Sequence, residues 1–113
     1  MRYLVETLCV LVLVVMPTAC GGDGNSGVCE SFCAKEAECY PPEEQIPRCE
    51  QYCRYVLDVS ADTSSECESA AAGAFECVGD LPTCEDVDAY WFEEPFDSYP
   101  CKAADDNFES ACF

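Results

Sequence analysis

Cysteine is the residue type that offers the most chemistry in this chain. Its 113 residues include 12 Cys and no His. Without His, the usual base beside a Ser or Cys nucleophile is missing, and so is a common zinc ligand. Structural zinc sites and thioredoxin-like redox sites also favour two residues between paired cysteines, and no such pair occurs. Disulfide bonds are therefore the favoured chemistry, which indicates an oxidising compartment.

Two pairs of cysteines share one spacing, with three residues between Cys29 and Cys33 and between Cys49 and Cys53. Residues four apart in a helix lie on one face, about one turn apart. In two antiparallel helices, the numbers of bonded residues add to a constant. Both Cys29 with Cys53 and Cys33 with Cys49 add to 82, which centres the hairpin on Tyr40-Pro41-Pro42, where proline ends a helix. We therefore predict these two disulfides.

Hydrophobic periodicity predicts an all-α, disulfide-rich domain of three to four short helices, since no stretch alternates as a strand does. Ser26 can cap the first helix, and Pro47 suits the first turn of the second. Ser65 and Glu68 have the spacing of a capping box for the third. The expected helices are residues 28–39, 47–59, 65–79 and 102–112, with one further helical turn near 84–92. The first helix carries Cys29, Phe32, Cys33 and Glu36 near one face.

The other six mature cysteines allow many pairings. Cys67 and Cys77 would lie roughly 15 Å apart along one helix, which exceeds the reach of a disulfide. The same argument excludes Cys101 with Cys112. The pairs that we predict are Cys39–Cys77, Cys67–Cys112 and Cys84–Cys101.

The N-terminus has the pattern of an export signal. Met1-Arg2 precedes an apolar run over residues 8–16, which is shorter than the roughly 20 residues of a membrane span. Pro17-Thr18-Ala19 and Cys20 follow. Here the chain resembles bacterial lipoprotein precursors, whose lipobox ends in two small residues and Cys. It departs from them at Pro17, where Leu is usual.

This resemblance implies a signal peptide over residues 1–19, cleaved before Cys20, and acyl chains such as palmitate on Cys20. Two or more acyl chains hold a protein durably on a membrane. Gly21, rather than Asp, follows Cys20, and the sorting habit of many Gram-negative lipoproteins then implies the outer membrane. Residues 20–27 would be a Gly-rich tether and residues 28–113 the Cys-rich domain. Besides Cys20, ten mature cysteines remain, an even number that can pair completely.

The mature chain carries the motifs Cys29-x3-Cys33-x5-Cys39, Cys49-x3-Cys53, Phe75-Glu76-Cys77-Val78-Gly79-Asp80-Leu81, Pro100-Cys101 and Ala111-Cys112. In these motifs it resembles the short Cys-rich predicted lipoproteins of myxobacteria and related bacteria. That resemblance implies a location and a helical fold, and it implies no function. The twin motif over residues 29–53 also resembles the helical hairpin of the small Tim chaperones of mitochondria.

The formal net charge is −18, and it stays so without residues 1–19 because Arg2 and Glu6 leave together. Such a surface repels nucleic acids and anionic membranes, and it favours cations and basic partners. We expect no nucleic-acid partner and no defined metal site. Nearby carboxylates favour diffuse, weak Ca²⁺ binding over a defined site, since the chain has no EF-hand pattern. The carboxylates concerned are Asp80, Glu85, Asp86 and Asp88.

Residues 85–99 combine acidic and aromatic side chains. The rings either cover the Ala-rich core or form a recognition loop with Tyr90 and Trp91 as anchors, since Trp and Tyr dominate binding hot spots. A partner there would be a basic protein surface or a glycan. The candidate binding residues are Tyr90, Trp91, Phe92, Phe96 and Tyr99.

These observations lead us to expect a lipid-anchored, non-enzymatic binding or structural module of the cell envelope. We expect no catalytic residue and no cofactor. The alternatives are a small calcium- or glycan-binding module and a small secreted enzyme that uses carboxylates. A carboxylate pair can hydrolyse glycosides, but among 23 acidic residues the presence of some pair indicates little.

Overall fold

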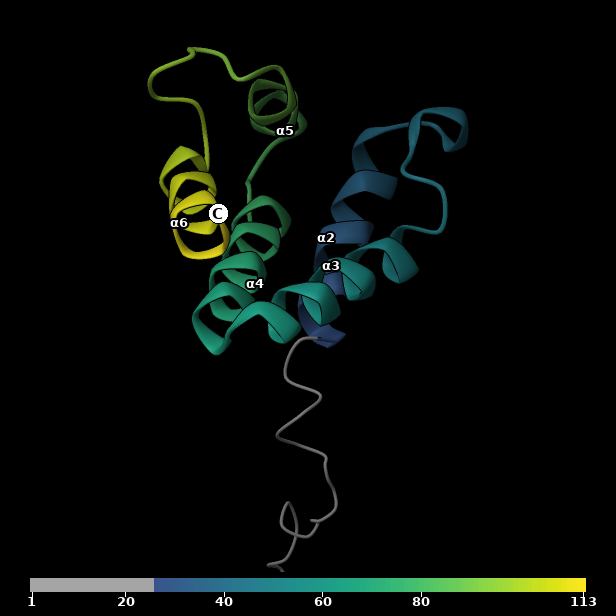
Figure 1. The fold of residues 1–113 in the computed structure, drawn as a ribbon. Helices are drawn as coiled ribbons and strands as arrows, with labels where there is room; N and C mark the ends of the chain where they lie inside the picture. The colour runs from purple at the N-terminus through teal and green to yellow at the C-terminus, as the bar shows by residue number, and fades with distance from the viewer. Residues whose placement is uncertain (1–25) are drawn as a thin grey trace, which may run out of the picture.

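The structure, a computed structural model, describes residues 26–113 as an all-α bundle (Figure 1). No strand occurs in this part of the chain. The expected fold class is confirmed, with five α-helices because residues 84–92 form a full helix. The elements are α2 (Ser26–Cys39), the 3-10 turn η3 (Pro42–Glu44), α3 (Cys49–Thr63), α4 (Ser65–Gly79), α5 (Cys84–Phe92) and α6 (Lys102–Cys112).

Two helices differ in length from the expectation. Helix α2 begins at Ser26, so Ser26 and Gly27 belong to its first turn and not to the tether. Helix α3 begins at Cys49 and not at Pro47, because Arg48 has a left-handed backbone with φ of 51°. The predicted signal peptide, Cys20 and the tether up to residue 25 lie outside the described residues.

Helix α4 has the predicted bounds, but its cap is the residue before the one predicted. Ser64 has the extended backbone of a capping residue, and its side chain accepts a hydrogen bond from the Cys67 amide at 3.0 Å. Ser65 is already the first residue of the helix, so its backbone does not have the capping geometry. Ser64 is also the one residue between α3 and α4, so the connection between these two helices is as short as a single residue.

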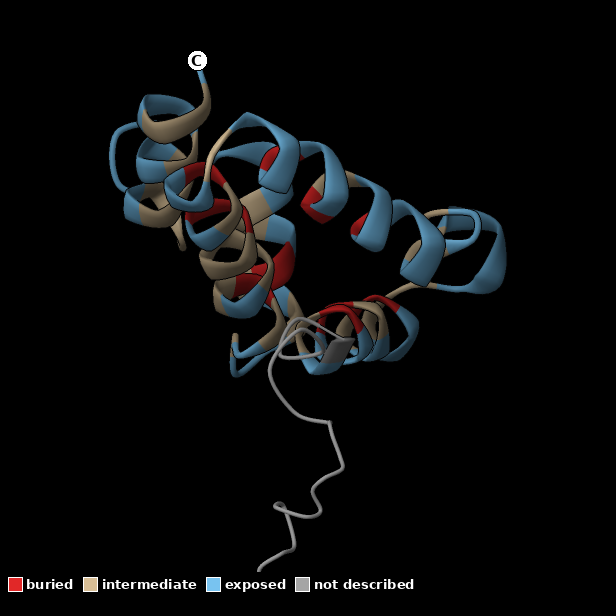
Figure 2. Cartoon of the chain, turned by 60° about the horizontal axis from the view of Figure 1, so that its bottom comes forward, coloured by how far each residue is buried: buried red, intermediate tan, exposed pale blue. Residues whose placement is uncertain are grey.

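Helix α4 is the centre of the bundle and contacts α2, α3 and α6. Small residues on its inner face, such as Ala70 and Ala71, are buried and let neighbouring helices approach. Gly79 has the same role toward α2, because a Cβ at this position would lie 3.1 Å from the Phe32 backbone nitrogen. The buried residues accordingly face the inside of the bundle (Figure 2).

The core combines disulfide sulfur with aliphatic and aromatic side chains. Phe32 is the largest side chain with almost no exposure, at 2%. A cluster of Cys29, Cys53, Leu57 and Ala71 joins α2, α3 and α4, and partly buried residues pack against it. These partly buried residues are Val56, Ala72, Phe75 and Phe108.

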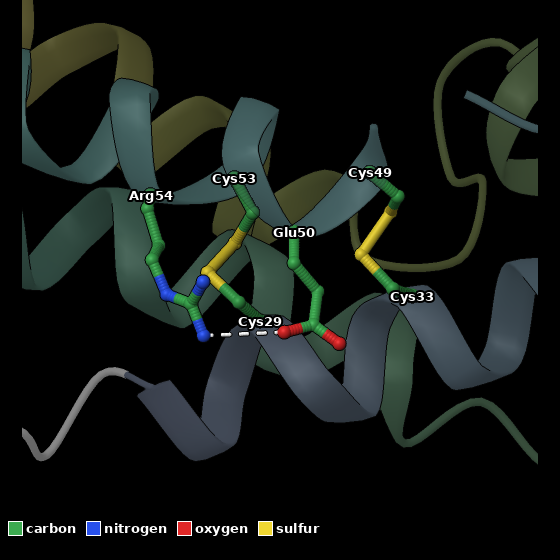
Figure 3. A network of polar contacts seen from close by, with 6 residues as sticks. All are labelled: Cys29, Cys33, Cys49, Glu50, Cys53 and Arg54. Atoms are coloured by element: carbon green, nitrogen blue, oxygen red, sulfur yellow. Dashed lines mark hydrogen bonds and ion pairs between the residues drawn. A yellow bond between two sulfur atoms is a disulfide. The ribbon is translucent and has the colours of Figure 1, made fainter. Parts of the chain in front are cut away.

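The first two helices form the predicted antiparallel hairpin. Cys29 is bonded to Cys53 and Cys33 to Cys49, with Cα–Cα distances of 5.6 and 5.8 Å. Figure 3 shows both bonds crossing from α3 to α2, beside the ion pair between Glu50 and Arg54 at 3.1 Å. Register and direction of the hairpin therefore follow from the shared spacing of its cysteines.

The predicted Cys67–Cys112 bond is also present, and it joins the start of α4 to the end of α6. The predicted Cys39–Cys77 and Cys84–Cys101 bonds are wrong, because the structure contains Cys39–Cys84 and Cys77–Cys101. Helices α4 and α6 are antiparallel neighbours, so the end of α4 meets the residue before α6. Cys84, at the start of α5, lies instead at the end of α2.

Candidate ligand-binding site

Helix α5 positions most of the predicted binding residues, and it begins at a well-formed cap. Thr83 has an extended backbone, and its hydroxyl accepts a hydrogen bond from the Asp86 amide at 3.1 Å. The helix ends at Glu93, whose backbone is left-handed with φ of 53°. The chain then turns away from the helix axis, so Phe96 and Tyr99 lie beyond the helical segment.

Three links between distant residues fix α5 against the end of α2. The first is the Cys39–Cys84 disulfide. The second is a short hydrogen bond from the Tyr40 hydroxyl to the Asp88 carboxylate. The third runs from the indole Nε1 of Trp91 to Oε2 of Glu36, at 2.9 Å. Helix α5 is therefore held at both ends, which makes its outer face a rigid platform.

The structure separates the five predicted binding residues into two groups. Tyr99 is buried and Tyr90 partly buried, whereas Phe92 and Phe96 are 71% and 76% exposed. Trp91 lies between these extremes at 43%. The two tyrosines thus cover the core, and the recognition-loop interpretation is confined to the other three.

Asp105 on α6 holds the two tyrosines in place. Its Oδ1 accepts a hydrogen bond from Tyr90 and its Oδ2 one from Tyr99, each at 3.0 Å. Burial, together with this carboxylate, raises the pKa of Tyr99 to about 12, and the same causes raise the pKa of Tyr90. Both hydroxyls therefore stay protonated at neutral pH and act as donors to Asp105.

Glu36 is a buried carboxylate on the inner face of α2, with 3% exposure. Its burial raises the pKa of Glu36 above the usual range, while the hydrogen bond from Trp91 lowers it. Sequence reasoning placed Glu36 on the buried face but did not select it as a site residue. The sequence signal that could have identified Glu36 is its spacing, since it lies on the same helix face as Cys29 and Phe32 and is the acidic residue there.

An unbroken series of aromatic contacts runs through the site. Phe32 lies between Phe75 and Trp91, with ring centroids 4.8 and 6.4 Å away. Trp91 contacts Tyr90 at 5.0 Å, and Tyr90 contacts Tyr99 at 6.1 Å. All these pairs have the edge-to-face geometry that aromatic quadrupoles favour.

Two hollows lie next to Trp91. The first has a volume of about 140 Å³ and lies against Phe32, Phe75 and Asp105. The second, which we call the acidic aromatic pocket, has a volume of about 300 Å³. Its lining comes from α2, η3, α5 and the residues that follow α2 and η3, and it consists of Glu36, Tyr40, Glu44, Ile46, Trp91 and Phe92. This lining provides two carboxylates and three rings, a set of groups that attracts cations.

Among residues 26–113, no three Cys, Asp or Glu side chains are grouped so as to hold a metal ion. The carboxylates considered for Ca²⁺ therefore do not converge, and Asp88 instead accepts the hydrogen bond from Tyr40. Nor does any helix in that stretch have the length and apolarity needed to cross a bilayer.

Comparisons with family models, with curated proteins and with solved structures returned no match. The fold and the site together define the class as a small, disulfide-stapled, all-α domain with a rigid aromatic surface.

Proposed function

We propose that the chain is a lipid-anchored, non-enzymatic binding module of the cell envelope, and that Phe92 and Phe96 contact a basic protein partner. The observation that carries this proposal is the exposure of these two rings, with Phe92 at the end of the held helix α5 and Phe96 in the segment that follows it. Phe, like Tyr and Trp, is enriched at the cores of protein interfaces. The surrounding acids, Glu93, Glu94 and Asp97, are exposed and complement a positive surface.

The pairing of the cysteines supports the lipid anchor. All ten cysteines from Cys29 to Cys112 are bonded to one another. Cys20 is then the one cysteine after residue 19 outside the disulfide set. Acylation needs a free cysteine thiol. Cys20 has no partner among the ten bonded cysteines, and it follows the apolar run and the small residues Thr18 and Ala19.

Replacing Cys20 by Ala is expected to move the protein from the membrane fraction to the soluble fraction, because the acyl chains attach at that sulfur. Fractionation of a Gram-negative host with immunodetection measures this. Cys9→Ala is the matched control, since that residue lies within the apolar run, and it should leave the protein in the membrane fraction. Membrane retention of the Cys20→Ala variant would contradict the anchor.

Replacing Phe92 and Phe96 together by Ser is expected to lower capture of the partner from envelope extracts by about tenfold or more, given the usual weight of aromatic anchors. Capture by the unchanged protein should also weaken as salt rises, because the partner is basic. Tyr55→Ser is the control, since Tyr55 is 67% exposed and lies on α3, outside the segment that carries Phe92 and Phe96. Equal capture by both variants would exclude this surface.

A further inference from the structure

Glu36 has an unusual position for a carboxylate. It is 3% exposed and lines the acidic aromatic pocket, where it accepts a hydrogen bond from Trp91. The ion pairs formed within residues 26–113 are Lys35–Glu38, Arg54–Glu50 and Lys102–Asp106, so none of them reaches Glu36. The ionised form of a buried carboxylate is costly unless a positive charge accompanies it, so a bound cation and the charged form of Glu36 would stabilise each other. The pocket therefore favours a cation.

The walls of the pocket select the kind of cation. Tyr40, Trp91 and Phe92 contribute three aromatic residues to its lining, and Ile46 adds an aliphatic one. Aromatic faces attract a cation through their quadrupole, and most strongly where water is excluded. A bare ammonium group would bring three N–H donors, and the side chains of the pocket offer acceptors mainly at Glu36, which already accepts from Trp91, and at the exposed Glu44. A methylated ammonium group presents its charge on C–H groups and needs no such acceptors.

We propose that the acidic aromatic pocket binds a methylated ammonium group, with the cation between the rings of Tyr40, Trp91 and Phe92. Glu36 is the buried counter-charge, and Glu44, which is exposed, is the second negative group at the pocket. The volume of about 300 Å³ accommodates a trimethylammonium group, since an apolar cavity of roughly 150 Å³ already binds benzene. The net charge of −18 draws cations toward the surface.

This inference goes beyond the proposed function, because a small cation binds here without the protein partner and without the anchor. The group could belong to a free molecule such as choline or to a choline lipid headgroup. Both have the same chemistry, and the experiment distinguishes them.

The test uses the full chain purified in a maltoside detergent, with choline chloride as the probe at constant ionic strength. Trp91 is the sole Trp of the sequence, so intrinsic fluorescence reports on the pocket directly. We expect a saturable change with choline. The neutral isostere 3,3-dimethyl-1-butanol should bind about tenfold more weakly or worse, because it lacks the charge that rings and carboxylates recognise. Equal binding of the two would overturn the proposal.

Glu36→Gln keeps an acceptor for the Trp91 indole and removes the charge, so we expect a loss of choline affinity of about tenfold. Glu30→Gln is the matched control, because Glu30 is exposed on the same helix and does not line the pocket. The control should bind as the unchanged protein does. Unchanged affinity of a folded Glu36→Gln variant would refute the role of the pocket.

If Glu36→Gln does not fold, Phe92→Leu provides the same decision, because Phe92 is 71% exposed and its replacement removes a ring but no charge. We expect a several-fold weaker response to choline from this variant, and an unchanged response would overturn the proposal. Phosphocholine, and maltoside micelles that contain either phosphatidylcholine or phosphatidylglycerol, are titrated in parallel. A response to choline alone supports a free ligand, and a response to the phosphatidylcholine micelles that the phosphatidylglycerol micelles do not give supports a choline lipid headgroup.

Discussion

The Phe32→Ala variant is expected to lose about 3–5 kcal/mol of unfolding free energy, the usual cost of removing a buried aromatic ring. Phe32 is 2% exposed and contacts Phe75 of α4 and Trp91 of α5. Its removal therefore leaves a cavity where three helices meet. The close approach of α4 at Gly79 leaves α2 little freedom to collapse into that cavity. Urea denaturation of both proteins, followed by circular dichroism, measures the difference.

Phe96→Ala is the matched control, since the same group is removed from a residue that is 76% exposed. Its cost should stay within about 0.5 kcal/mol, as for most surface substitutions. If both variants lost the same stability, Phe32 would not be the centre of the core.

Replacing Cys29 and Cys53 together by Ala is expected to cost about 2–5 kcal/mol. Part of the loss comes from the greater freedom of the unfolded chain, in which these residues are 24 positions apart. The other part comes from packing, because both residues are 0% exposed and belong to the core cluster. Thermal unfolding followed by circular dichroism gives the shift in midpoint.

The Cys33–Cys49 bond provides the comparison within the same hairpin. It closes 16 positions, and both of its cysteines are partly exposed, so its replacement by Ala should cost less. A larger cost for this outer bond would contradict the packing argument.

The parts of the fold that could be predicted are those with local signals. The bounds of α4 and α6 follow from periodicity within each segment. The hairpin of α2 and α3 follows from cysteines in two neighbouring segments, separated by a proline turn. The cap of α4 was misplaced by one residue, because Ser64 and Ser65 are adjacent and share the capping chemistry.

The two wrong disulfides have different causes. The bonds Cys67–Cys112 and Cys77–Cys101 add to 179 and 178, so the constant-sum rule of the first hairpin also applies to α4 and α6. That signal was present in the sequence. Cys39–Cys84 had no such signal, because it depends on where α5 lies. Contacts between residues far apart in sequence, such as Glu36 with Trp91, determine that position.

The sequence could predict which segment carries the candidate site, but not which of its side chains are exposed. Sequence composition identified residues 85–99, and the structure shows which rings there are exposed. Asp105 decides this outcome, because it provides one carboxylate oxygen to each of Tyr90 and Tyr99. Glu36 completes the pocket from the opposite end of the chain. No spacing rule in the sequence relates these carboxylates to their rings. Glu36 and Trp91 lie on different helices, and Asp105 lies on another helix than Tyr90 and outside the loop of Tyr99.

The five disulfides together have a consequence for proteolysis. The loops that they close overlap, so every peptide bond between Cys29 and Cys112 lies inside at least one loop. A protease that cuts the chain once in this range releases no fragment. Exposed residues such as Phe96 remain attached after a cut beside them, because the Cys77–Cys101 and Cys67–Cys112 bonds span that segment. A nicked molecule separates into pieces only when a reductant is present.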